Sequence, residues 1–344
     1  MGIPAAIEGS IGQSRIFLKK CFSGGLFREV VMRIAIFGAG GAGGYFGARL
    51  AQSGEDVTFI ARGKHLEAIR GHGLRVDSVL GDFVVSPVQA TGDPAQVGIV
   101  DMVLLGVKAW QVTTALQALR PLVGSETTIV PLQNGVEAPN QIAKEFGAKH
   151  VVGGLAKIIS FKVGAGHIRH AGADPYIAIG ELDKRTSKRT ERIRQVFKKA
   201  AISVDVPTDI EAALWQKFLF VVSWGGVGAV TDAPIGVIRS VPETRRMLEQ
   251  SMSEVLSVAQ AKKIAVKDDT VQQTMAFVDT LPQNGTTSLH RDIMDGNPSE
   301  LDFWNGAVVR LGQEVGVATP LNSFIYNSLL PKELRAQGKL SFPE

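Results

Sequence analysis

Three glycines near residue 40 stand at a spacing that suits the binding of a phosphate group. Gly38, Gly40 and Gly43 follow the apolar run 33–37, typical of a buried strand, and precede a helical pattern over 43–52. In such a loop the first glycine permits a sharp turn, the second lets a pyrophosphate reach the backbone, and the third lets helix and strand pack closely. The helix N-terminus then offers free N–H groups to an anion. A glycine-rich turn of another α/β protein is the alternative, but the order of elements favours a dinucleotide site at Gly38, Ala39, Gly40, Gly41, Ala42 and Gly43.

Arg62 indicates which dinucleotide this site takes. In NAD-binding units an Asp or Glu at the end of the second strand accepts hydrogen bonds from the ribose hydroxyls. Here the second apolar run ends in Arg62, which stands 19 residues after Gly43. A guanidinium cannot accept a hydrogen bond, but its donors fit a phosphate. Unless Arg62 is simply a solvated loop residue, the predicted cofactor is NADPH.

Lys217 is the strongest candidate for acid–base chemistry. It is the only charged residue over 212–231, and at helical spacing it shares a face with Ile210, Leu214 and Val221. An unpaired ammonium among apolar side chains is costly, so burial should lower its pKa. Such a lysine is paired, extends its charged end to the surface, or is functional. Beside a dinucleotide-binding domain, the functional interpretation is favoured.

The elements that position these residues alternate between strand and helix in the first part of the chain. Apolar runs over 99–105 and 127–132 predict buried strands, and a helical pattern follows each of them. Alternation of this kind predicts a parallel sheet with right-handed crossovers. Lys108 and Asn134 come just after these two strands, where ligands of such sheets bind. A solvated lysine and an Asn-Gly turn are the plain alternatives.

The pattern changes further along the chain. Over 151–206, short apolar runs separated by glycines predict antiparallel strands that extend the sheet, with a helix over 183–199. After Pro207 the strand signals stop, and we expect helices at 209–224, 243–263, 267–280, 286–294, 299–316 and 320–335. Thr208 and Glu211 form a capping box that would start the first of them. The predicted fold is α/β, with a Rossmann-type dinucleotide-binding domain over 32–207 and an all-helical C-terminal domain over 208–344.

Composition limits the classes of function. The chain has 344 residues, 45% hydrophobic and 20% charged, and a net charge of +4. No basic cluster is interleaved with aromatic residues, so nucleic acid is not an expected partner. The longest apolar stretch, 218–230, is shorter than the ~18 residues of a membrane span, so no membrane contact is expected. A single cysteine suits a reducing compartment, and we expect a cytoplasmic protein.

Two further expectations concern metal binding and the N-terminus. His167 and His170 form the only pair at a metal-ligand spacing, but in a strand they would point to opposite faces, so no metal site is predicted. Residues 1–31 precede the first strand, and Lys19 interrupts their apolar run, so they are a poor secretory signal. We expect this segment to lie outside the fold.

The oligomeric state stays open, with a homodimer among the options.

Glu300 and Ser288 have plain structural explanations when spacing alone is considered. Glu300 follows Asn297 and Pro298, and Asn-Pro-x-Glu is a good helix start in which the glutamate reaches back as a cap. Ser288 stands in the first turn of a predicted helix, where serine is common. Neither residue would be assigned to a site from periodicity.

Several blocks of residues together resemble the ketopantoate reductases (2-dehydropantoate 2-reductases). Besides the glycine loop and Arg62, they are Gly-Val-Lys-Ala-Trp-Gln-Val at 106–112, Leu-Gln-Asn-Gly at 132–135, Leu-Trp-Gln-Lys at 214–217, Ser-Leu-His-Arg-Asp at 288–292 and Glu-Leu-Asp at 300–302. The resemblance runs from about residue 32 to residue 331. It implies NADPH-dependent reduction of 2-dehydropantoate to pantoate, in pantothenate and coenzyme A biosynthesis.

The resemblance also implies roles for single residues. Lys217 would be the general acid that stabilises and protonates the alkoxide formed when a hydride reaches the keto carbon. Asn134 would hold the nicotinamide end of the cofactor and the substrate. Ser288 and Glu300 would bind the hydroxyl and carboxylate groups of the substrate, and Lys108 would act on the cofactor side.

The chain departs from the family pattern beside the predicted acid. Where characterised members carry asparagines one and two helical turns after the lysine, it has Val221 and Gly225, and Gly285 stands in place of a third. Each lost hydrogen bond typically costs about 0.5–1.5 kcal/mol, so the resemblance indicates the reaction more firmly than the substrate. One alternative is a paralogue that reduces a less polar 2-keto acid, and another is a non-catalytic NADP-binding sensor. The sensor is disfavoured, because a protein that only binds NADP has no need of Lys217 in an apolar stripe.

Overall fold

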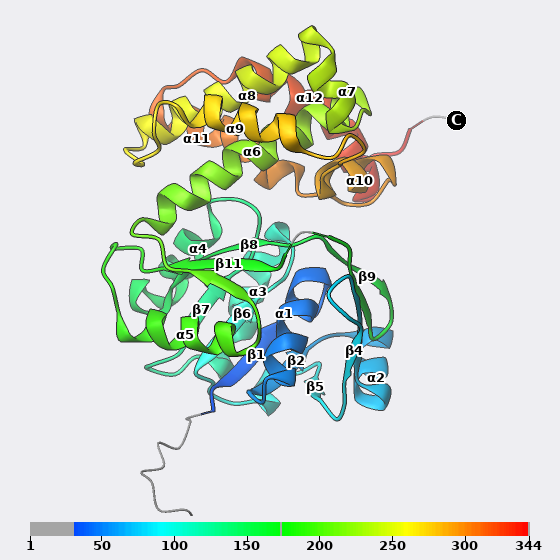
Figure 1. Ribbon diagram of the computed structural model, residues 1–344, viewed down its shortest axis with the longest axis vertical. Coiled ribbons are helices and arrows are strands. Elements are labelled where there is room, and N and C mark those ends of the chain that lie inside the picture. Colours follow the sequence, from blue (N-terminus) through cyan, green and yellow to red (C-terminus); the bar gives the residue numbers. More distant parts are fainter. Residues whose placement is uncertain (1–30, 173, 343–344) are drawn as a thin grey trace, which may run out of the picture. The chain divides into compact units, whose positions relative to one another are not determined.

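The computed structural model describes residues 31–172 and 174–342. Its first part is built on a five-stranded parallel sheet in the order β5-β2-β1-β6-β7 (Figure 1). The strands are β1 (Arg33–Phe37), β2 (Asp56–Ile60), β5 (Gln89–Thr91), β6 (Met102–Leu105) and β7 (Thr128–Pro131). In this register Phe37 lies opposite Ile60 and Leu105, so the two strands that flank β1 end level with it. The expected Rossmann-type sheet is confirmed.

Helices cover the sheet because its central strand is apolar on both faces. Ile34 and Ile36 of β1 belong to one hydrophobic core, and Ala35 and Phe37 belong to another. Helix α1 (Gly41–Gln52) contributes to the first core, while α3 (Val112–Leu119) and α4 (Ala138–Phe146) contribute to the second. A further helix, α2 (Gly63–His72), follows β2. Since the loops that join these strands to their helices lie at one edge of the sheet, that edge is where a ligand is expected.

The strands expected over 151–206 do not simply extend this sheet. β8 (Gly153–Lys157), β11 (Tyr176–Gly180) and β12 (Ser203–Asp205) form a three-stranded sheet, while β9 (Ser160–Gly164) and β10 (His167–His170) join β3 (Leu74–Ser78) and β4 (Phe83–Val85) in a four-stranded one. The antiparallel expectation is correct for β8 with β11 and for β9 with β10. It is wrong for β10 with β3 and for β11 with β12, which are parallel. A helical crossover between β11 and β12 makes their parallel pairing possible.

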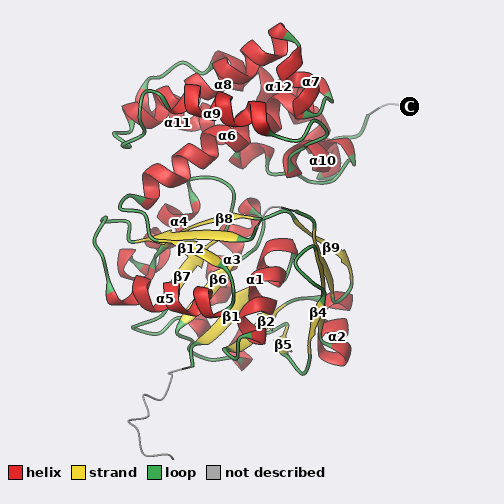
Figure 2. Ribbon diagram, viewed as in Figure 1, coloured by secondary structure: helices red, strands yellow, loops and turns green. Residues whose placement is uncertain are grey.

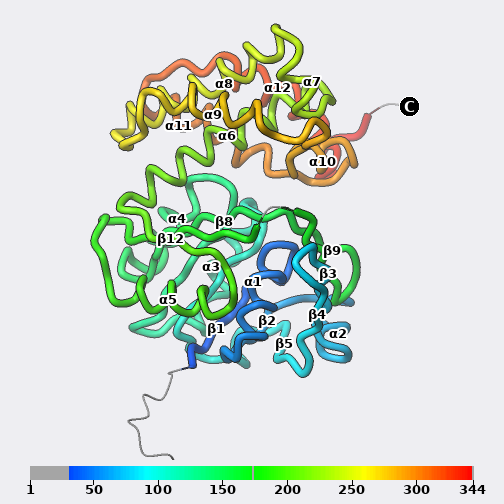
Figure 3. The backbone as a smooth tube through the Cα atoms, in the orientation of Figure 1, coloured from blue at the N-terminus to red at the C-terminus, as the bar shows by residue number. Residues whose placement is uncertain are grey.

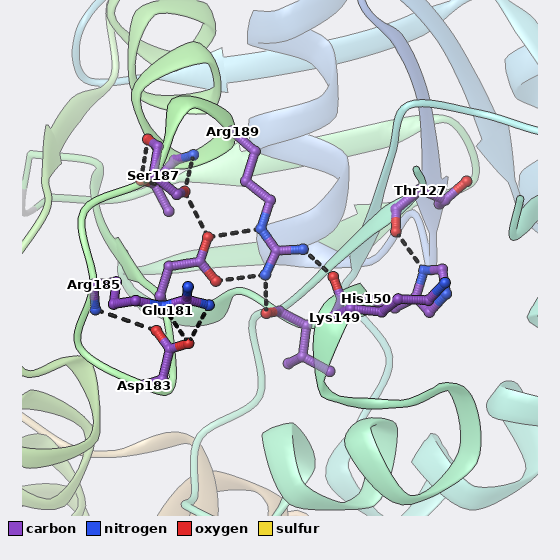
Figure 4. Close-up of polar contacts among 10 residues, drawn as sticks. Thr127, Lys149, His150, Glu181, Asp183, Arg185, Ser187 and Arg189 are labelled. Atoms are coloured by element: carbon purple, nitrogen blue, oxygen red, sulfur yellow. Dashed lines mark hydrogen bonds and ion pairs between the residues drawn. The ribbon is translucent and has the colours of Figure 1, made fainter. Parts of the chain in front are cut away.

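That crossover is α5 (Lys188–Lys199), which begins later than the expected residue 183 because polar contacts hold the preceding residues in a loop. The hydroxyl of Ser187 accepts a hydrogen bond from the N–H of Thr190 at 3.1 Å and donates one to Glu181 at 2.6 Å. Arg189 donates to the same carboxylate and to the backbone carbonyls of Lys149 and Val151 (Figure 4). These contacts tie β11 and α5 to the segment that leads into β8.

The rest of the chain is helical, as the colouring of Figure 2 and the trace in Figure 3 show. The helices are α6 (Ile210–Thr231), α7 (Ile235–Ser240), α8 (Pro242–Ala261), α9 (Thr270–Thr280), α10 (Ser288–Met294), α11 (Asn305–Val315) and α12 (Pro320–Ala336). The helical C-terminal region is thus confirmed, although α7 was not expected. The helix expected over 299–316 is wrong in its first part, because Trp304 (φ −107°, ψ −97°) separates a short 3-10 turn at Leu301–Phe303 from α11.

Two expected helix caps are also wrong. The cap of α6 is Asp209 rather than Thr208, since Oδ1 of Asp209 accepts a hydrogen bond from the N–H of Ala212 at 3.0 Å. Glu300 precedes the 3-10 turn Leu301–Phe303, but its side chain makes no capping hydrogen bond, because its carboxylate bonds to the distant N–H of Ala109. The predicted N-terminal extension falls almost wholly on residues 1–30, which lie outside the described residues.

Helix α6 forms the centre of the helical part and packs against α8, α10 and α12. Within the described ranges it is the one helix long and apolar enough to cross a membrane, with 22 residues. The apolar segment is therefore longer than the stretch 218–230 that was identified from the sequence. Of its apolar window, 61% is buried inside the protein. Core helices of soluble proteins have the same length and composition, so this is weak evidence for a membrane span.

Candidate active site

The loop after β1 makes the close approaches that its glycines were expected to allow. Gly38 has a φ of +101°, and a Cβ there would lie 2.8 Å from the backbone nitrogen of Val107. A Cβ on Gly43 would collide with the carbonyl oxygen of Gly38. At Gly40 an added Cβ would meet nothing within 4 Å, so its backbone is open to a ligand. The loop and the N-terminus of α1 therefore fit a dinucleotide pyrophosphate.

Neighbouring elements hold this loop in place. Gly41 packs so closely on β9 that a side chain would collide with the carbonyl group of Ser160. The carbonyl oxygen of Ala39 accepts a hydrogen bond from Nε2 of His65 at 2.8 Å, and Nδ1 of the same ring accepts one from the N–H of Gly166 at 2.9 Å. Burial lowers the pKa of His65, although the bond to Ala39 raises it. His65 is a neutral bridge between the glycine loop and the β9–β10 turn.

Arg62 lies where the sequence predicts it, directly after β2 and at the N-cap of α2. Its side chain is exposed, and it has no hydrogen bond or ion pair within the described part of the chain. It is not among the residues that line the cleft described next. The guanidinium is therefore free to bind a phosphate at the same sheet edge as the glycine loop.

A cleft of about 930 Å³ extends from the glycine loop to the helical part of the chain. Its walls come from the loop, from the ends of β6, β7 and β8, and from α6, α9 and α10. This volume is within the range of small-molecule sites. The cleft brings together five residues that the sequence analysis singled out, namely Lys108, Asn134, Lys217, Ser288 and Glu300.

Lys217 places its ammonium group in this cleft. Nζ donates a hydrogen bond to Oδ1 of Asn134 at 2.7 Å and to the carbonyl oxygen of Ala156 at 2.5 Å. Burial lowers the pKa of Lys217 to about 8, while the charge of Glu300 raises it and that of Lys157 lowers it further. An ammonium that is held by neutral acceptors and has a pKa of about 8 is suited to proton donation.

Asn134 is held in position by its neighbour Gln133. Nε2 of Gln133 donates to the carbonyl oxygens of Leu105 at 2.8 Å and Val107 at 2.9 Å, which ties the end of β7 to the end of β6. Gly135 has a φ of +132°, so glycine allows the chain to turn directly after Asn134. Sequence reasoning identified Asn134 and missed Gln133, because no local pattern shows a side chain that bridges two strand ends.

Glu300 is buried, and its carboxylate joins the helical part to the loop after β6. It is 6% exposed, and Oε1 accepts a hydrogen bond from the N–H of Ala109 at 2.8 Å. Burial raises the pKa of Glu300, while the charge of Lys108 lowers it. Nζ of Lys108 itself donates to Oδ2 of Asp292 at 2.8 Å. Burial lowers the pKa of Lys108, but the charges of Glu300 and Asp292 outweigh this effect and raise it.

Ser288 is the first residue of α10, but it does not cap that helix. The cap is Thr287, whose hydroxyl accepts a hydrogen bond from the N–H of His290 at 3.2 Å. Ser288 lines the cleft, and its hydroxyl has no hydrogen-bond partner in the described ranges. Arg291, one turn later on the same helix, also lines the cleft, and sequence reasoning did not single it out.

Trp304 explains the substitution of an expected asparagine by Gly225. A Cβ on Gly225 would lie 2.6 Å from Cζ3 of the Trp304 indole and 3.0 Å from its Cε3. Trp304 is 1% exposed, so its ring fills the space that a side chain at position 225 would need. Val221 and Phe220 line the cleft on the same helix. Positions 221 and 225 therefore offer the cleft no amide group, although the family pattern predicts one at each.

Across 31–172 and 174–342, no three His, Cys, Asp or Glu side chains are grouped in a way that could hold a metal ion. The two histidines of β10 instead contact β3. Nε2 of His167 lies 2.7 Å from Oδ2 of Asp77, and Nδ1 of His170 lies 2.9 Å from Oγ of Ser78.

The fold and the cleft together define a dinucleotide-dependent oxidoreductase. Residues 34–184 match the family model described as Ketopantoate reductase PanE/ApbA, and residues 209–333 match Ketopantoate reductase PanE/ApbA C terminal. The chain belongs to the ketopantoate reductase family.

Individual relatives agree with this assignment. A 2-dehydropantoate 2-reductase of Nostoc sp. is 31% identical over 302 residues, which cover 86% of this chain and 94% of the relative. The crystal structure of a 2-dehydropantoate 2-reductase from Geobacter metallireducens has a TM-score of 0.82 and 32% identity, covering 87% of this chain and 99% of that chain. The ternary structure of D-mandelate dehydrogenase with NADH and anilino(oxo)acetate has a TM-score of 0.81, with 89% and 99% coverage, but its 23% identity shows a common fold alone.

Proposed function

We propose that this protein reduces a 2-keto acid to the corresponding 2-hydroxy acid with NADPH. The observation that carries the proposal is Lys217, a lysine with a lowered pKa in the cleft that begins at the glycine loop. The names of the curated relatives support 2-dehydropantoate as the first candidate substrate, with pantoate as the product, in pantothenate and coenzyme A biosynthesis. A cytoplasmic location forms part of the proposal, and the single cysteine supports it.

Lys217 is the proposed general acid. When bound, the nicotinamide supplies the hydride that adds to the keto carbon. As negative charge develops on the keto oxygen, the ammonium of Lys217 stabilises it and then donates a proton from Nζ. The hydrogen bonds to Asn134 and Ala156 hold Nζ in one position, so the proton donor is oriented before the substrate arrives.

The other polar residues of the cleft are proposed to bind and orient the reactants. Ser288 has an uncommitted hydroxyl for the substrate. Glu300 can exchange a hydrogen bond with a substrate hydroxyl while the N–H of Ala109 fixes its carboxylate. Asn134, which bonds to Lys217, would hold the nicotinamide end of the cofactor and the substrate, and Lys108 would contribute its charge beside the end of β6.

The preference for NADPH is proposed from Arg62. Its guanidinium is exposed and unpaired in the described part of the chain, at the position where NAD-binding units carry an acidic residue. A phosphate on the 2′ position of the ribose would receive charge-assisted hydrogen bonds there. Gly38 to Gly43 would bind the pyrophosphate through backbone N–H groups.

A second candidate substrate is a less polar 2-keto acid. The observation that favours it is the contact between Gly225 and Trp304, which leaves no room for an amide side chain at position 225. Val221 likewise carries no amide, so a substrate hydroxyl gains no hydrogen bond from positions 221 and 225. The reaction and the role of Lys217 are the same for both candidates.

The test is a set of initial rates of NADPH oxidation by the purified protein. The substrates are 2-dehydropantoate, pyruvate and 2-ketoisovalerate, with a control that lacks substrate. Turnover confined to 2-dehydropantoate supports the pantothenate assignment, and turnover confined to the plainer acids supports the second candidate. Tight NADPH binding without turnover of any keto acid would contradict the proposal and favour the sensor interpretation.

A further inference from the structure

Arg291 places a cationic group in the cleft. No carboxylate among the described residues forms an ion pair with it. It lies on α10, one turn after Ser288, and lines the cleft. Its Nη1 donates to the carbonyl oxygen and to the hydroxyl of Thr286, both at 3.0 Å. The guanidinium also lies over the ring of Phe161, 5.1 Å from its centroid. These contacts hold the group in a fixed orientation.

Part of the hydrogen-bonding capacity of Arg291 remains unused. A guanidinium has five N–H donors. Within 31–172 and 174–342, Nε and Nη2 have no hydrogen-bond partner, since both bonds of the guanidinium use Nη1. Burial lowers the pKa of Arg291, and the charges of Asp292 and Asp295 compensate for this only in part. Asp292 itself is bonded to Lys108. A partly buried cation with free donors is the arrangement that favours an oxyanion.

We propose that Arg291 binds the carboxylate of the keto acid substrate, together with the hydroxyl of Ser288. The two residues are three positions apart on α10, so they lie on one face of the helix. A carboxylate can accept two hydrogen bonds from the free side of the guanidinium and one from Ser288. The ammonium of Lys217 is then reserved for the keto oxygen. This inference rests on the proposed function and adds a residue that determines specificity for acids.

The test compares a keto acid with its uncharged ester. In steady-state assays with NADPH, Arg291→Gln should raise the KM for 2-ketoisovalerate about 10- to 100-fold, as expected for a lost hydrogen bond to a charged group. The KM for methyl 2-ketoisovalerate and the KM for NADPH should stay within about threefold. Arg291→Lys should recover part of the preference for the acid, because it restores the charge but not the planar fork. Arg246→Gln, which removes an exposed ion pair on α8, is the control.

Other outcomes overturn the assignment. Equal effects on acid and ester would mean that Arg291 only supports the fold, and the thermal midpoint of each variant checks this. A rise in the KM for NADPH alone would place the cofactor pyrophosphate at Arg291. Loss of acid preference in Lys157→Gln but not in Arg291→Gln would move the carboxylate site to β8. If the wild type turns over no keto acid, the proposed function fails by itself, and calorimetric binding of 2-ketoisovalerate with NADP+ still tests Arg291.

Discussion

Nζ of Lys217 donates a 2.7 Å hydrogen bond to Oδ1 of Asn134, although the two residues are 83 positions apart. One residue lies on α6, and the other follows the last strand of the parallel sheet. The second acceptor of Nζ is also neutral, the carbonyl oxygen of Ala156. Because no carboxylate bonds directly to the ammonium, its pKa is free to follow burial downward.

Replacing Lys217 should remove the chemical step and leave cofactor binding intact. For Lys217→Met we expect kcat to fall about 100- to 10,000-fold, the usual contribution of a positioned acid. Lys217→Arg should not restore activity, because a guanidinium keeps its proton. Steady-state rates and fluorescence titration with NADPH measure the two effects, with the exposed Lys198→Met on α5 as the control. Unchanged turnover in Lys217→Met would rule out its role as acid.

The pH dependence of reduction should report the lowered pKa of Lys217. The group donates its proton only when charged, so kcat should be high below about pH 8 and fall as the pH rises through that value. Because the charge of Lys157 lowers this pKa, Lys157→Gln should move the descending limb to higher pH. The measurement is a pH profile of kcat at saturating substrate for both proteins. A limb that stays in place, or moves to lower pH, contradicts the assignment of the limb to Lys217.

Short-range patterns were sufficient to predict the parallel sheet, the glycine loop and the helical C-terminal region. Each depends on a few consecutive residues, such as the β1 run and the glycines that follow it. Lys217 could also be identified as a candidate, because a single charge in an apolar helix is visible in the sequence. The roles assigned to Lys108, Ser288 and Glu300 came from the family resemblance and remain predictions.

Contacts between distant segments could not be predicted in the same way. The capping interpretation of Glu300 failed because Asn-Pro-x-Glu is a local pattern, whereas its carboxylate bonds to the N–H of Ala109, 191 residues away. Likewise, Trp304 fills the space beside Gly225, and no local pattern shows that these two residues, far apart in the sequence, lie against each other. The strand pairings β10–β3 and β11–β12 also depend on the path of the chain between them.

Arg62 should determine the preference between the two nicotinamide cofactors. Arg62→Ala should raise the KM for NADPH about 10- to 100-fold, because hydrogen bonds to charged groups contribute about 1.5–3 kcal/mol. The KM for NADH should change less than about threefold, since NADH lacks the phosphate. Steady-state rates with each cofactor measure this, and Arg70→Ala, on the helix that follows Arg62, is the control. Equal losses for NADPH and NADH would refute a contact between Arg62 and the 2′-phosphate.

Restoring the two asparagines of the family pattern should have different effects at the two positions. Gly225→Asn should lower the thermal midpoint, because overpacking against Trp304 typically costs about 1–3 kcal/mol. Val221→Asn should fold, because Val221 already lines the cleft. Its amide should raise the ratio of kcat/KM for 2-dehydropantoate over 2-ketoisovalerate about 2- to 10-fold, the effect of one hydrogen bond. Equal stability of the two variants would show that Trp304 does not restrict position 225.

His65, which connects the glycine loop to the β9–β10 turn, should influence cofactor binding through one of its two ring nitrogens. The partners of His65 fix its tautomer, since the carbonyl of Ala39 can only accept and the N–H of Gly166 can only donate. Nε2 therefore carries the proton. A glutamine side chain can reach the position of Nε2 and keep the donation to the loop, whereas the shorter asparagine can keep only the acceptor near Nδ1.

These two substitutions separate support of the glycine loop from support of the β9–β10 turn. If the bond to Ala39 orients the loop for a pyrophosphate, His65→Asn should weaken NADPH binding about 5- to 10-fold, the effect of one hydrogen bond, and His65→Gln should weaken it less. Fluorescence titration with NADPH measures the affinity, and thermal unfolding shows whether either variant is destabilised. The opposite order, with His65→Gln the weaker binder, would mean that the contact with Gly166 matters more than the contact with the loop. Protonation of Nδ1 breaks the contact with Gly166 but leaves the Nε2 donation to Ala39 intact. As the pH falls through the lowered pKa of His65, NADPH affinity of the wild type should therefore hold if the contact with the loop matters, and decline if the contact with Gly166 matters.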